Sequence, residues 1–211
     1  MIETTPIKKF VVLTHLLYSG ITGGFTSEVE EKMMKEVDAI IAGNADEPGT
    51  HFIVSVIEGR PLDPRIAELI SRIPQDRVHM PRREGSWHNY FGEDAGLQEE
   101  IGKRRFSGEV EIESYGNLVD MCAASNARMV ADFVSKKAKL KQITILGGAW
   151  DSEEITRVSF GVKQALPQQA RYAFHNFEAD TVRAEDIVKK TMGSHADKLV
   201  YAWPRKYKLR A

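Results

Sequence analysis

The sequence predicts an α/β fold, a Rossmann-like three-layer sandwich with a mainly parallel sheet and helices on both of its faces. Several short apolar runs rich in β-formers do not alternate with polar residues, which is typical of strands buried on both faces. Between these runs, apolar residues recur at helical spacing. Strands that alternate with helices indicate βαβ units, in which successive strands run parallel.

The first half of the chain alternates between strand and helix. The run Phe10-Val11-Val12-Leu13 indicates the first buried strand. Ser27 and Glu30 form a capping-box pattern that opens a helix, and Gly43-Asn44 ends it. The elements expected in this half are strands at 10–14, 51–57 and 77–80 and helices at 27–42 and 61–73.

The second half continues this alternation after a polar and irregular segment at 81–110, in which Trp87, Tyr90 and Phe91 are embedded. Glycines 147 and 148 are expected to end a strand that begins at Gln142. The elements expected in this half are strands at 109–114, 142–147 and 171–174 and helices at 120–135, 152–165 and 184–192. The sequence contains no internal repeat and no low-complexity linker, so residues 1–211 are expected to form a single domain.

The charge balance restricts the partners of the chain. Lys and Arg number 29 and Asp and Glu number 30, for a formal net charge of −1. This balance gives no general attraction to nucleic acid or to anionic membranes and permits self-association, so a homo-oligomer is expected. A basic and aromatic tail at about 198–211 could bind RNA, but packing against its own domain or a neighbouring subunit is favoured, because Tyr201 and Trp203 are amphipathic.

The single cysteine, Cys122, excludes an intramolecular disulfide framework and a multi-cysteine metal site. No apolar run reaches the roughly 18–20 residues that a membrane-spanning helix needs. The N-terminus lacks the charged and apolar regions of a signal peptide, so a cytoplasmic location is expected.

Ligands of open α/β sheets bind beyond the carboxyl ends of the strands, and three segments place residues there: 14–15, 81–91 and 116–122. In the third, Cys122 lies at the expected start of a helix, where backbone N–H groups and the helix dipole favour thiolate over thiol. The same N–H groups could receive an oxyanion. Asp120 is a candidate N-cap of this helix. The alternative is that Cys122 is a small buried apolar residue.

The segment from Gly116 to Ala123 resembles the nucleophile turn of the isochorismatase-like cysteine hydrolases, which include nicotinamidases. The glycine six residues before the cysteine and the aspartate two before it are both present. Asn126-Ala127 stands where the family has Thr-Ala. The resemblance spans roughly residues 8–192, and its specific part is the cysteine turn. It implies that a Cys122 thiolate attacks an amide or carbamoyl-type carbonyl, and that a cis bond between Asn117 and Leu118 helps to form the oxyanion hole.

The family has a catalytic triad of cysteine, aspartate and lysine, and this sequence differs from it at the aspartate and the lysine. His15 stands where the family has its aspartate base, and the loop after Met80 offers Arg82 or Arg83 in place of a lysine. His15 could act as the base of a Cys–His dyad. Either arginine could supply positive charge but could not shuttle a proton. The alternative is a catalytically silent relative that binds a small ligand or a partner protein.

The remaining candidate residues concern the substrate and the metal. Trp87 and Tyr90 are expected to line a pocket for a small-molecule substrate or ligand. Nicotinamidases carry a metal site built from an Asp-x-His pattern, but the matching stretch 58–65 holds no histidine, so no metal and no cofactor are expected. The glycine-rich turn at 20–24 could cradle a nucleotide phosphate, although it lacks the usual glycine spacing and the P-loop lysine.

Overall fold

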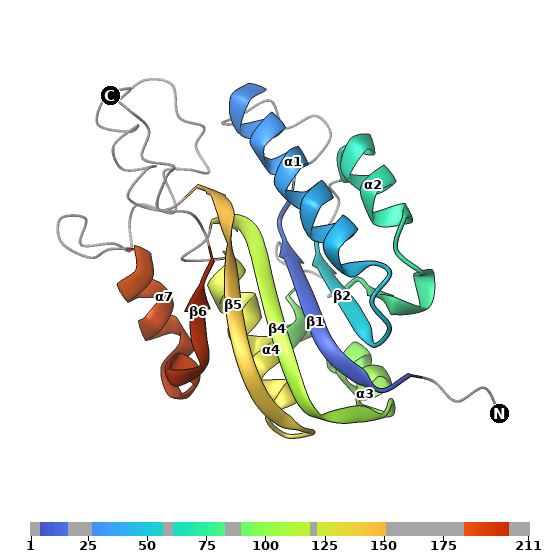
Figure 1. The fold of residues 1–211 in the computed structure, drawn as a ribbon, viewed down its shortest axis with the longest axis vertical. Coiled ribbons are helices and arrows are strands. Elements are labelled where there is room, and N and C mark those ends of the chain that lie inside the picture. The colour runs from blue at the N-terminus through green and yellow to red at the C-terminus, as the bar shows by residue number, and fades with distance from the viewer. Residues whose placement is uncertain are drawn as a thin grey trace.

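The computed structural model of the protein describes residues 5–16, 27–56, 61–82, 90–118, 122–150 and 184–202. Within these ranges six parallel strands form one sheet in the order β3-β2-β1-β4-β5-β6 (Figure 1), which confirms the predicted fold class. The strands are β1 (Ile7–Thr14), β2 (Thr50–Ser55), β3 (Val78–His79), β4 (Phe106–Leu118), β5 (Lys139–Trp150) and β6 (Leu199–Tyr201). Because β2 and β3 follow on one side of β1 while β4 lies on its other side, the strand order reverses between β1 and β4.

Helices cover both faces of this sheet, as the sequence predicts. Helices α1 (Ser27–Asn44) and α2 (Pro64–Ser71) pack on one face through the apolar side chains that they share with β1 and β2. Helices α3 (Ala95–Gly102), α4 (Ala124–Val134) and α7 (Ala184–Met192) pack on the other, where α4 lies behind the strands in Figure 1. Short 3₁₀ turns occur at η1 (Gln75–Arg77), η2 (Phe91–Glu93) and η4 (Gly193–Lys198). No helix in the described part of the chain is long and apolar enough to cross a membrane.

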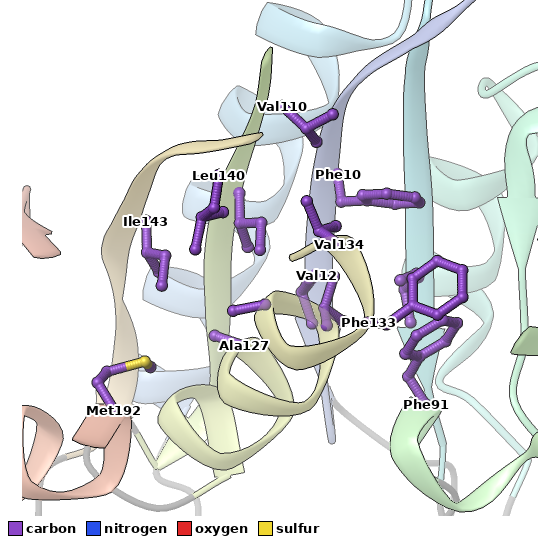
Figure 2. Packing of buried hydrophobic residues seen from close by; sticks show 14 of the residues in the cluster. Phe10, Val12, Phe91, Val110, Ala127, Phe133, Val134, Leu140, Ile143 and Met192 are labelled. Atoms are coloured by element: carbon purple, nitrogen blue, oxygen red, sulfur yellow. The ribbon is translucent and has the colours of Figure 1, made fainter. Parts of the chain in front are cut away.

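The first strand contributes to the apolar core on both sides of the sheet. Phe10 and Val12 face α4, where Figure 2 shows them among buried side chains of β4, β5, α4 and α7. Val11 and Leu13 face α1 and α2. All four side chains are fully buried. This two-sided burial is the physical reason for the uninterrupted apolar run in the sequence, because a strand with one solvated face would alternate.

Two glycine segments that were predicted to end or to follow a strand are parts of longer strands. Gly116 and the two residues after it continue β4, and glycines 147 and 148 lie inside β5. The β4–β5 ladder shifts register where Tyr115 pairs with Gly147, and Gly147 has a φ of 138° there. Glycine supports such an irregularity without ending the strand, because it has no Cβ to clash.

Two further elements were absent from the prediction. The segment 81–110, predicted to be irregular, contains α3, whose N-terminus is capped by the Asp94 side chain accepting from the Leu97 N–H. Strand β6 begins the basic and aromatic tail and pairs with β5, and the Tyr201 hydroxyl donates to the Glu185 carbonyl at 2.9 Å. The start of the tail therefore packs on its own chain, one of the two arrangements predicted. The predicted helix at 152–165, the strand at 171–174, the glycine turn at 20–24 and Trp203 lie outside the described residues.

Candidate functional site

The reversal of the strand order places the carboxyl ends of β1 and β4 next to each other, and Thr14 pairs with Gly116. A Cβ atom on Gly116 would lie 2.9 Å from the Thr14 carbonyl oxygen and 3.2 Å from the Ala123 Cβ. The end of β1, the end of β4 and the start of α4 thus meet where only a hydrogen atom fits. This close contact explains why the residue six positions before Cys122 is a glycine. It also lies at the position where open α/β sheets bind their ligands.

Cys122 is half-buried at the entry to α4. Together with Ala123 it has the backbone of a widened helical turn and leads directly into α4. The Ser114 hydroxyl donates to the Ala123 carbonyl oxygen at 2.9 Å and anchors this turn to β4. The first turn of α4 carries no acidic side chain. The thiol thus lies directly before the N-terminus of α4, where backbone N–H groups and the helix dipole favour the thiolate.

His15 follows β1 directly and is held in an unusual backbone conformation. Its φ is 51°, in the left-handed region that glycine favours, and only 2% of its surface is exposed. Its N–H donates to the Ser55 carbonyl oxygen at 3.0 Å, and its ring lies 5.2 Å from the ring of Tyr90, measured between centroids. A left-handed non-glycine residue costs about 1 kcal/mol or more and persists only where its surroundings hold it.

The backbone contacts place His15 and Cys122 on either side of one junction. His15 follows Thr14 and Cys122 precedes Ala123, and both Thr14 and Ala123 border the space at Gly116. The structure thus brings the predicted nucleophile and the predicted base to the same edge of the sheet, and brings the predicted pocket residue Tyr90 onto the ring of His15.

A buried amide, Asn126, ties this region together, and sequence reasoning noted it only as a position of the family motif. Its Nδ2 donates to Thr14 Oγ1 at 3.1 Å and to Ser55 Oγ at 2.6 Å. Its Oδ1 accepts from the Phe91 N–H at 3.2 Å. One sequence signal could have pointed to this network. The second halves of β1 and β2 are apolar, yet both strands end in a hydroxyl residue at the ligand-binding edge of the sheet.

The structure describes only some of the other predicted site residues. Arg82 is exposed, and its backbone N–H donates to Asp94 Oδ2 at 2.8 Å, beside the start of α3. Asn117 and Leu118 end β4, and no peptide bond is cis in the described ranges, so the expected cis bond between these two residues is wrong. Arg83, Trp87 and Asp120 lie outside the described residues.

A pair of histidines lies apart from this site, with His51 near the amino end of β2 and His79 at the end of β3. His51 Nδ1 and His79 Nε2 are 2.9 Å apart, and the two rings stack with an angle of 9° between their planes. Burial lowers the pKa of His51 to about 3 and that of His79 to about 4, and the positive charge of Arg104 contributes to both shifts. Both rings are therefore neutral at physiological pH. His51 lies four residues before the carboxyl end of β2, so the pair is separate from the region around Cys122.

Comparison with protein-family models and with curated proteins returned no match. Among solved structures, an isochorismatase-like hydrolase from Alkaliphilus metalliredigens is similar to this chain at 12% sequence identity. The match covers 79% of this chain and 99% of that chain, with a TM-score of 0.40. A similarity at this level carries no argument about chemistry, and the fold rests on the sheet topology itself.

Proposed function

We propose that the protein is a cysteine hydrolase of the isochorismatase-like type that acts on a small amide or carbamoyl-type substrate. The observation that carries the proposal is the junction at Gly116, where the entry to α4 with Cys122 meets the end of β1 with His15. Thiolate catalysis requires a base within reach of the thiol, and a helix N-terminus favours the thiolate. The burial of His15 in a left-handed conformation supports a functional role, because such strain concentrates at active sites.

In the proposed reaction His15 accepts the thiol proton and the Cys122 sulfur attacks the substrate carbonyl carbon. Backbone N–H groups at the entry to α4 receive the developing oxyanion. As the C–N bond breaks, the imidazolium returns its proton to the leaving nitrogen, and an acyl thioester remains on the sulfur. Water then attacks the thioester, His15 accepts a proton from that water, and the thiol is restored by proton return.

The remaining residues have supporting roles in this proposal. Tyr90, already packed on the His15 ring, would border the substrate together with Trp87. Arg82 or Arg83 would supply the positive charge near the developing negative charge, and neither would exchange protons. Main-chain groups at Asn117 and Leu118, at the end of β4, would border the oxyanion.

The test is ammonia release from a panel of primary amides and N-carbamoyl compounds by the full-length chain. Turnover by the wild type that disappears in both Cys122→Ala and Cys122→Ser, with unchanged circular dichroism, supports the proposal. Turnover that survives Cys122→Ala contradicts it, because the chemistry would then come from other residues. If the wild type shows no turnover and an ordinary thiol, but members of the panel raise its melting temperature, the silent ligand-binding alternative holds.

A further inference from the structure

The side chain of Asn126 makes three hydrogen bonds to residues around His15. The hydroxyl of Thr14, the residue before His15, accepts from Nδ2 at 3.1 Å. The Ser55 hydroxyl accepts from the same nitrogen at 2.6 Å, and the Ser55 carbonyl oxygen accepts the His15 N–H at 3.0 Å. The Phe91 N–H donates to Oδ1 at 3.2 Å, and Tyr90, one residue earlier, packs on the His15 ring.

Asn126 also belongs to the helix that directly follows the cysteine. It lies four residues after Cys122, in the first turn of α4. Both N–H donors and the oxygen of the amide are engaged, and the side chain is fully buried, so water does not compete for these bonds. One side chain therefore connects the helix of the nucleophile to the ends of β1 and β2 and to the segment of Tyr90.

We propose that Asn126 is a positioning residue that holds His15 in register with Cys122. The proposal rests on the hydrolase function proposed above. Asn126 touches no reacting atom in it and acts through the Thr14 hydroxyl, the Ser55 hydroxyl and the Phe91 N–H. The left-handed backbone of His15 needs such support, because this conformation is unfavourable for a histidine by itself.

The pH dependence of Cys122 alkylation by iodoacetamide in the native full-length chain measures this alignment. The chain has one cysteine, so the reaction reports on a single thiol. If His15 stabilises the thiolate, His15→Ala moves the half-maximal rate to higher pH. For a midpoint above pH 6, the rate at pH 6 falls about tenfold for each pH unit of that movement. Asn126→Ala is expected to move the profile in the same direction, by at least half as much.

Thr14→Val provides a second variant with nearly the same shape that removes one hydrogen bond of the network. It is the decisive variant if Asn126→Ala does not fold, and it is expected to lower the rate at pH 6 about threefold, a movement of about half a pH unit. The matched control is Val130→Ala, which opens a cavity one turn further along α4 in the same buried core. Its alkylation profile is expected to equal that of the wild type.

The outcomes separate the two proposals. A wild-type profile with the midpoint of an ordinary thiol overturns the hydrolase function and the positioning role together. A low wild-type midpoint that rises in His15→Ala but stays unchanged in Thr14→Val and in any folded Asn126→Ala overturns the positioning role alone. A shift in Val130→Ala as large as that in Asn126→Ala or Thr14→Val also overturns it, because general loosening of the fold would then explain the effect.

Discussion

Acid should destabilise this protein through the stacked histidines 51 and 79 before its carboxylates begin to protonate. Each of the two residues is 4% exposed. The pKa values of about 3 and about 4 lie far below the ordinary value of 6.5, and burial is the first cause of both shifts. The two rings share one hydrogen bond 2.9 Å long, so protonation of both nitrogens would place two donors face to face. Arg77 and Arg104 add repulsion, which Asp76 offsets only in part.

The sign follows from proton binding. Between pH 6.5 and about 4 the unfolded chain binds protons on these histidines and the folded chain does not, so the free energy of unfolding falls as the pH falls. Linkage gives about 2 kcal/mol for each histidine between pH 7 and pH 5, or about 4 kcal/mol for the pair. This loss is a large part of the roughly 5–15 kcal/mol by which domains are stable.

The assay is urea unfolding at pH 7, 6 and 5, with His51→Asn as the variant. The asparagine amide can keep the hydrogen bond to His79 Nε2 while removing one titrating group. The difference in stability between pH 7 and pH 5 should shrink by about 2 kcal/mol in this variant. The control Val78→Ala, in the same short strand as His79, should lower stability equally at each pH. A wild type that loses less than about 1 kcal/mol between pH 7 and pH 5 would refute the reasoning.

Three other substitutions test the structure around the site and the helix caps. Gly116→Ala should cost about 1–3 kcal/mol in urea unfolding, because its Cβ would lie 2.9 Å from the Thr14 carbonyl oxygen, and a cost near zero would contradict this close approach. Asn126→Ala should lower the free energy of unfolding by about 3 kcal/mol, because it leaves two buried hydroxyls and one buried N–H without their present partner. The neighbouring control Ser125→Ala should lower it by less than about 0.5 kcal/mol. Asp63→Ala should cost about 1 kcal/mol, because the Asp63 side chain accepts from the Arg65 N–H at the start of α2, and unchanged thermal melting would show that this cap contributes nothing.

The sequence predicted the elements whose signal is local. The run at 10–13 identified β1, because a strand buried on both faces needs apolar residues at every position. The capping box at Ser27 marked the first residue of α1, and the helix predicted at 184–192 has the bounds of α7.

The errors arose where long-range pairing overrode a local signal. Glycines 147 and 148 are typical turn residues, yet the ladder with β4 keeps them in β5. Helix α3 buries only Ile101 fully, so its periodic signal was weak. That Cys122 and His15 lie at one edge of the sheet was predicted through a family resemblance, and their catalytic pairing stays a prediction. The hydrogen bonds of Asn126 connect residues 35 to 112 positions apart and have no local signature.

The most direct test of the central claim is the pH dependence of Cys122 alkylation by iodoacetamide in the folded wild-type chain. The proposed dyad of Cys122 and His15 at a helix start predicts a half-maximal rate at least about one pH unit below the value near 8.5 of a free cysteine. A thiol that reacts with a midpoint at or above 8.5, or that reacts only after the chain is unfolded in urea, would contradict the claim that Cys122 is an activated nucleophile.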